Sequence, residues 1–177
     1  MAGAAPATVV TSQLKPCRYE ARHAPNILRL RRTAYRVAYR LLWLAALVRR
    51  PRGQGAKAAL VCDGEVLLVR QSYGPARWEL PGGGIRRGEE PLAALQRELE
   101  EELGLSISAA VPLAVRPGPG RSSAHRTHLF RVDVPTRILR LDPVEIIEAR
   151  WCDPANPPAP LGWMVADALA LAGLARS

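Results

Sequence analysis

"LPGGGIRRGEEPLAALQRELEEELGL", residues 80–105, places a run of glycines in front of a segment that carries six glutamates. Pro91 stands where a proline fits the first turn of a helix, and Gly104 stands where a glycine commonly ends one. These two signals predict a helix over residues 90–103.

This helix carries two stripes of different character. Four leucines at helical spacing predict the face that packs on a sheet, namely Leu92, Leu95, Leu99 and Leu103. Glu98, Glu101 and Glu102 follow an i, i+3, i+4 spacing along the margin of that face, where like charges repel one another. A glutamate-rich helix is most often a solvated surface, but converging carboxylates are also the ligands that Mg²⁺ or Mn²⁺ requires.

The spacing of the whole segment favours the metal interpretation. From Gly83 it contains five residues, Glu89, seven residues, and then "RELEEELGL", residues 97–105. This pattern resembles the Nudix box of MutT-like hydrolases, Gx5Ex7REUxEExGU with U aliphatic, at every specified position. The resemblance implies an α/β/α sandwich with a mixed β-sheet, and metal-dependent cleavage of the pyrophosphate bond of a nucleoside diphosphate linked to another moiety.

The resemblance also implies roles for single residues. The implied metal ligands are Glu98, Glu102, Glu101 and the carbonyl of Gly82. Glu89 and Arg97 match the pair that ties the loop to the helix and orients the carboxylates. The implied cofactor is Mg²⁺ or Mn²⁺, which acidifies water and clamps a diphosphate.

The general base is left open by the box. Glu101 is one candidate, and Glu145 and Glu148 precede or begin a closing strand where family members often carry an extra acidic residue on a loop. Glu145 is favoured over Glu148 because it would lie at the loop-facing start of that strand. An ordinary solvated glutamate fits either position equally well.

The substrate is defined only as a nucleoside diphosphate derivative. ADP-ribose, a nucleotide sugar and an oxidised nucleoside triphosphate are the candidates. Arg70, Arg126 and His128 could contact the substrate, although each also fits an ordinary surface or strand residue. A second functional class also stays open: a catalytically silent Nudix-fold module that binds or regulates, and that is attached to membrane or nucleic acid by a basic helix.

The remaining pattern divides the chain into a tail (1–25), a basic amphipathic helix with a linker (26–55) and the Nudix domain (56–177). Asp63-Gly64 between two apolar runs predicts a β-hairpin. Further expected elements are a short strand near residues 77–80, strands near 106–115, 125–134 and 145–151, and a helix within 161–176.

The expected helix over residues 26–50 concentrates the basic charge of a chain whose formal net charge is +9. Its apolar stripe, including Leu30 and Val37, could pack on the domain or on a second copy in a homodimer, or lie on an anionic membrane surface. Nucleic acid is less favoured because few aromatic residues are available for stacking. Three widely spaced cysteines without zinc spacing fit a reducing cytoplasm, with peripheral membrane contact as the alternative location.

Overall fold

The computed structural model describes residues 53–118 and 125–174, together with residues 18–20 and five residues between 30 and 37. The sheet has six strands in the order β1-β6-β3-β2-β5-β4. Their bounds are β1 (Arg18–Glu20), β2 (Gln54–Cys62), β3 (Glu65–Gln71), β4 (Val111–Pro117), β5 (Arg126–Asp133) and β6 (Ile146–Cys152). The pair β2–β5 is parallel and the other pairs are antiparallel, so the sheet is mixed as predicted.

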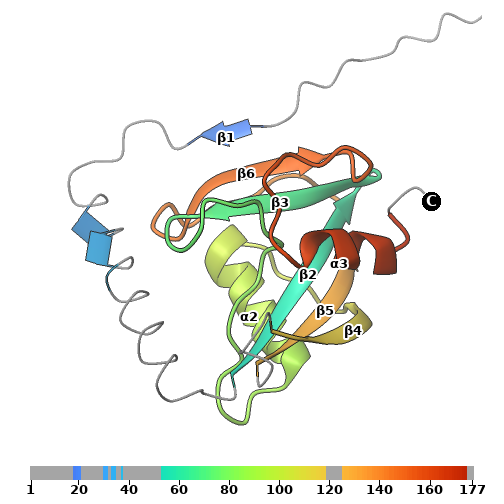
Figure 1. The fold of residues 1–177 in the computed structure, drawn as a ribbon, viewed down its shortest axis with the longest axis horizontal. Coiled ribbons are helices and arrows are strands. Elements are labelled where there is room, and N and C mark those ends of the chain that lie inside the picture. Colours follow the sequence, from blue (N-terminus) through green and yellow to red (C-terminus); the bar gives the residue numbers. More distant parts are fainter. Residues whose placement is uncertain are drawn as a thin grey trace, which may run out of the picture.

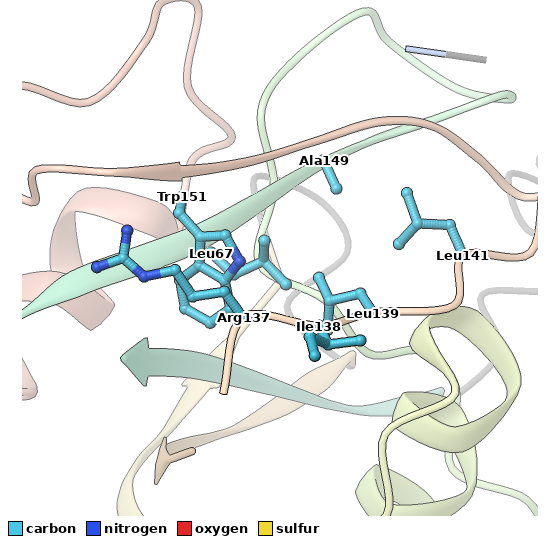
Figure 2. A pocket seen from close by; sticks show the side chains of 7 residues that line it. All are labelled: Leu67, Arg137, Ile138, Leu139, Leu141, Ala149 and Trp151. Atoms are coloured by element: carbon cyan, nitrogen blue, oxygen red, sulfur yellow. The ribbon is translucent and has the colours of Figure 1, made fainter. Parts of the chain in front are cut away.

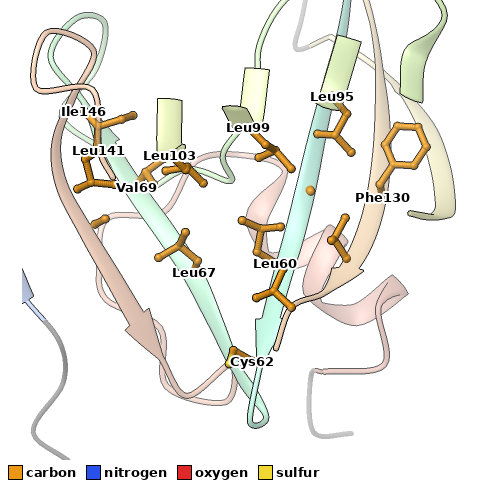
Figure 3. Packing of buried hydrophobic residues seen from close by; sticks show 14 of the residues in the cluster. Leu60, Cys62, Leu67, Val69, Leu95, Leu99, Leu103, Phe130, Leu141 and Ile146 are labelled. Carbon is orange, nitrogen blue, oxygen red and sulfur yellow. The ribbon is translucent and has the colours of Figure 1, made fainter. Parts of the chain in front are cut away.

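Two helices cover opposite faces of this sheet (Figure 1). The helix α2 (Pro91–Leu103) contributes Leu95, Leu99 and Leu103 to one buried cluster with β2, β3, β5 and β6, which Figure 3 shows from close by. The helix α3 (Val165–Leu171) packs Val165 and Leu169 into a second cluster on the other face. The α/β/α sandwich is therefore confirmed.

The hairpin between β2 and β3 opens the domain at the predicted turn. Asp63 and Gly64 both have positive φ, 50° and 78°, which is the backbone of a type I′ turn that matches the twist of two antiparallel strands. Away from this turn the two strands separate. Only two residue pairs are in direct register, Val61 with Val66 and Cys62 with Glu65.

Residues 79–85 fill the gap that opens between β2 and β3. Glu79 exchanges two backbone hydrogen bonds of 2.9 Å with Val69 of β3. On the other side, the amides of Ala58 and Ala56 donate to the carbonyls of Pro81 and Gly83, at 3.1 and 2.9 Å. The glycine run is thus held as an irregular ribbon inside the sheet, directly before α2.

The helix α2 begins and ends where the sequence predicts. Pro91 occupies the first turn, and Gly104 terminates the helix in the left-handed region with φ 61°. The amides of Gly104 and Leu105 donate to the carbonyls of Glu100 and Leu99, which satisfies acceptors that the helix end leaves open.

Several predicted boundaries were wrong. Residues 18–20 were expected in a loosely ordered tail, but they form β1 and pair with the open edge of β6. Near residues 77–80 there are isolated bridges in place of a strand. β4 starts only at Val111, and α3 is shorter than the amphipathic pattern suggested.

Little of the predicted N-terminal helix lies within the described residues. Those between 30 and 37 are helical and exposed, and the rest of residues 26–50 lie outside the described part of the chain. Within the described residues, no helix is long and apolar enough to cross a bilayer.

Candidate active site

Three consecutive glycines shape the loop in front of α2. Gly82 has φ 117°, and a Cβ there would overlap the carbonyl oxygen of Ala56. A Cβ at Gly83 would overlap the carboxylate of Glu98, whereas Gly84 faces open space. The backbone therefore requires glycine at the first position, whereas a side chain at the second would displace a candidate metal ligand.

Glu102 is the buried member of the three candidate carboxylates. It is 1% exposed, and its Oε2 accepts a hydrogen bond of 2.9 Å from the Gly82 amide. Burial raises the pKa of Glu102 to about 7, although the Gly82 amide and Lys57 oppose that rise. Glu98 and Glu145 raise the same pKa further, so both lie close enough to Glu102 to repel its charge.

Arg97 joins the loop to the helix. Its guanidinium donates to both carboxylate oxygens of Glu89, at 2.9 and 3.0 Å, and to the Gly84 carbonyl at 2.9 Å. It also donates to Glu98 at 2.6 Å and to Glu101 at 3.2 Å. A planar guanidinium can serve several acceptors in fixed directions, which suits it to hold this set of acids in place.

The Glu89 carboxylate is held in its charged form. The hydrogen bonds from Arg97 and from the Arg86 amide lower the pKa of Glu89 to about 2. The hydrogen bonds to Glu89 and then to Glu98 raise the pKa of Arg97 above its ordinary value. This pair therefore stays ionised at any physiological pH and fixes the geometry of the loop.

The acidic residues around Gly82 offer the donor chemistry of a hard divalent cation. Glu98 and Glu102 lie near one another on α2, and Glu101 is half-exposed beside Arg97 and Arg86. Within residues 53–118 and 125–174, no three acidic, histidine or cysteine side chains already converge closely enough to hold an ion. The oxygen-only donor set nevertheless fits Mg²⁺ or Mn²⁺, which take carboxylate and carbonyl oxygens.

A family model described as the NUDIX domain matches residues 51–170, which include this loop and helix. The chain belongs to the Nudix family. A solved MutT Nudix hydrolase from Burkholderia pseudomallei has a TM-score of 0.62 and 27% identity, covering 67% of this chain and 96% of that one.

Two curated proteins that are similar to this chain are named for different substrates. A diphosphoinositol polyphosphate phosphohydrolase 3-alpha of Mus musculus is 38% identical over 89 residues, which cover 48% of this chain and 54% of the relative. A putative 8-oxo-dGTP diphosphatase 2 of Mycobacterium tuberculosis is 47% identical over 55 residues, covering 29% and 39%. The matches span about half or less of the length of these relatives.

The two further candidates for a general base lie in different surroundings. Glu145 is near Glu102, and its carbonyl accepts a hydrogen bond of 2.7 Å from the amide of Ser72. Glu148 instead forms ion pairs with Arg70 at 3.2 Å and Arg150 at 3.4 Å. Of the two, Glu145 is therefore the one that lies near the Glu102 carboxylate.

The three candidate substrate-binding residues lie in two different places. Arg70 is paired with Glu148 and lies 5.8 Å from the centre of the Trp78 ring, which belongs to the core cluster of the α3 face. Arg126 and His128 lie on β5 beside the start of β2, opposite Gln54 and Ala56 in the register. His128 Nε2 is 3.1 Å from the Gln54 side-chain oxygen.

Two residues that lie near Glu102 were not predicted from the sequence. Lys57 donates to the Leu80 carbonyl at 3.1 Å and lowers the pKa of Glu102. Gln71 donates to the second carboxylate oxygen of Glu102 at 3.5 Å. Lys57 could have been recognised as the single charged residue in the apolar run "AKAALVC", residues 56–62. Nothing in the sequence distinguishes Gln71 at the end of its strand.

Proposed function

We propose that this chain is a divalent-metal-dependent hydrolase that cleaves the pyrophosphate bond of a nucleoside diphosphate linked to another moiety. The observation that carries the proposal is the buried Glu102 beside Glu98 and Glu145. Such a group of acids lowers the stability of the folded chain when they are ionised. A bound cation would offset this loss of stability. A role in catalysis would explain why the chain carries the acids in spite of it.

The residues of the chain would divide the work as follows. Glu98, Glu101, Glu102 and the Gly82 carbonyl would hold Mg²⁺ or Mn²⁺, which when bound acidifies water and neutralises phosphate charge. Glu145 would accept the proton of the attacking water, with Glu101 as the second candidate. Arg97 and Glu89 would orient the ligands without touching the substrate.

We also propose which residues contact the substrate and which compounds it could be. Arg126 and His128, beside the glycine loop, would contact the phosphates or the ribose, whereas the ion pair with Glu148 makes Arg70 the weakest candidate. ADP-ribose, a nucleotide sugar and an oxidised nucleoside triphosphate remain the candidate substrates. The names of the relatives add a diphosphoinositol polyphosphate to the compounds that should be tested.

A substrate panel in the presence of Mg²⁺ or Mn²⁺ tests this proposal. The panel contains ADP-ribose, nucleotide sugars, dinucleoside polyphosphates, 8-oxo-dGTP and a diphosphoinositol polyphosphate. At least one compound should be hydrolysed, and Glu102→Gln should lower kcat/KM by about 100-fold or more, since it removes a charged candidate ligand.

The control is Glu90→Gln, which changes an exposed glutamate at the start of α2 and should leave the rate unchanged. If the wild-type chain binds panel members but hydrolyses none of them, the hydrolase proposal is wrong. The silent binding module would then be the better description.

The N-terminal helix is the subject of a separate proposal. Two described residues of the predicted apolar stripe, Leu30 and Val37, are 71% and 52% exposed. We propose that the stripe contacts a second copy or an anionic membrane surface. Size-exclusion chromatography with light scattering, and co-sedimentation with anionic liposomes, would distinguish the two when compared with a Leu30→Asp/Val37→Asp variant.

A further inference from the structure

A cavity of about 340 Å³ lies on the α2 side of the sheet, at the hairpin end of β3. Its sheet wall consists of Leu67 from β3 with Ala149 and Trp151 from β6. The other wall is the loop after β5, through residues 137–139 and 141, as Figure 2 shows. Gln71, which contacts Glu102, lies at the far end of β3, so this cavity is separate from the glycine loop.

The indole of Trp151 has an unused hydrogen-bond donor. The residue is 2% exposed, and its Nε1 has no hydrogen-bond partner among the described residues. In Figure 2 the ring nitrogen lies on the side of the indole that is turned toward the loop leucines. Buried indole N–H groups normally find an acceptor, so a donor left open at a cavity wall indicates that a ligand completes it.

The chemistry of the walls limits what that ligand can be. Arg137 is the charged residue of the lining, and its guanidinium is committed to Glu65 at 2.5 Å and to Asp63 at 3.4 Å. The other lining side chains are aliphatic or aromatic, and among them the Trp151 N–H is the polar group. An ordered water needs two to four polar partners, so one side-chain donor among apolar side chains holds water poorly.

The size of the cavity sets the size of the ligand. An apolar cavity of about 150 Å³ is enough to bind benzene. A cavity of about 340 Å³ therefore accommodates roughly two fused rings. It also falls within the range of about 300–1,000 Å³ that is typical of small-molecule sites.

We propose that this cavity binds a small apolar molecule of two fused rings that carries one carbonyl oxygen, and that this oxygen accepts a hydrogen bond from Trp151 Nε1. The loop that forms the second wall is tied to α2, because the Arg140 amide donates to the Leu103 carbonyl at 2.8 Å and the Asp142 amide to the Glu102 carbonyl at 2.9 Å. Binding at the site does not depend on the proposed hydrolase activity.

The test uses the full chain labelled with ¹⁵N and follows the indole N–H resonances during a titration with 1-tetralone, a bicyclic ketone. Trp151→Phe identifies the Trp151 resonance. Tetralin, which has the same rings without the oxygen, is the matched ligand. We expect a saturable downfield shift of the Trp151 resonance with tetralone, and binding of tetralin weaker by about fivefold because the hydrogen bond is lost.

Variants separate the hydrogen bond from the cavity. In Trp151→Phe, tetralone and tetralin should bind with equal affinity, since the donor is gone. Ala149→Leu should fill the cavity and abolish binding of both, and Trp163→Phe, at an exposed tryptophan, should leave both affinities unchanged. The proposal is overturned if the Trp151 resonance does not shift, if Trp151→Phe keeps the preference for tetralone, or if the Trp151 N–H exchanges with solvent as fast as an exposed indole.

Discussion

Arg97 is the side chain on which most of the candidate active site depends. It holds Glu89, Glu98, Glu101 and the Gly84 carbonyl at the same time. A lysine at this position would keep the charge but could not serve these acceptors together, because an ammonium is a compact donor without the guanidinium fork. We expect Arg97→Lys to lower kcat/KM by roughly 10–100-fold, as is common when a residue that orients metal ligands is changed.

Steady-state kinetics at several metal concentrations would check this expectation. The loss should be partly restored by excess metal, because Arg97 positions the ligands and is not one of them. Arg87→Lys, at an exposed neighbour, is the matched control and should behave as the wild type. An unchanged rate in Arg97→Lys would show that Glu98 and Glu101 do not need this anchor.

At this scale the sequence predicted the identity of the box residues but not their environment. The spacing on α2 placed Glu98, Glu101 and Glu102 on one edge, because helical periodicity is a local property. It could not show that Glu102 is buried while Glu101 is half-exposed. That difference depends on the loop at Gly82, whose position is set by hydrogen bonds to strands distant in sequence.

The glycine loop is the element on which the geometry of the candidate site depends, and its three glycines should respond differently to alanine. Gly82→Ala should lower the free energy of unfolding by about 2 kcal/mol or more, because both its φ of 117° and the contact with Ala56 oppose a Cβ. Gly83→Ala should leave the fold intact but displace the Glu98 carboxylate, and so lower kcat/KM about tenfold or more.

Gly84→Ala is the internal control for both variants, since a Cβ there meets no atom within 4 Å. Urea unfolding and kinetics on the three variants would separate the effects on stability and on the site. Equal losses of stability in all three would mean that the loop is not held between β2 and β3 in the way described.

The elements that the sequence predicted well carry their signals locally. The hairpin at Asp63-Gly64 and the ends of α2 at Pro91 and Gly104 depend on turn and cap residues. The errors have non-local causes. β1 has only three residues and pairs with a strand near the other end of the chain. α3 starts late because the Trp78 backbone bonds to Pro160 and Gly162 and holds that segment extended.

At the scale of the molecule, the parallel pairing of β2 with β5 explains why the site lies where it does. Parallel neighbours require a crossover connection, and here it contains β3, the glycine loop, α2 and β4. β2 and β3 separate after their turn, so the loop enters the sheet beside Ala56 and delivers α2 to the same place. The resemblance implied this fold, but composition and periodicity alone could not have predicted the gap.

The burial of Glu102 should make the stability of the whole metal-free chain depend on pH. Its pKa is about 7 in the folded state against an ordinary value of 4.5, so the folded state binds more protons between these values. The stabilisation by the protonated form is fully present below pH 4.5 and is lost as the pH rises through 7. We expect Glu102 to account for a loss of about 2–3 kcal/mol between pH 5 and pH 8.

Urea unfolding in EDTA at several pH values, compared between the wild type and Glu102→Gln, isolates this contribution. The comparison is needed because burial lowers the pKa of His125, which makes stability rise with pH in part of the same interval. The difference between the two proteins should grow steadily from pH 5 to pH 8, since Glu102→Gln cannot ionise at this position. Mg²⁺ should shrink that difference at high pH by stabilising the ionised form. A difference that stays constant with pH would mean that Glu102 is ionised throughout and that the group of acids does not destabilise the metal-free fold.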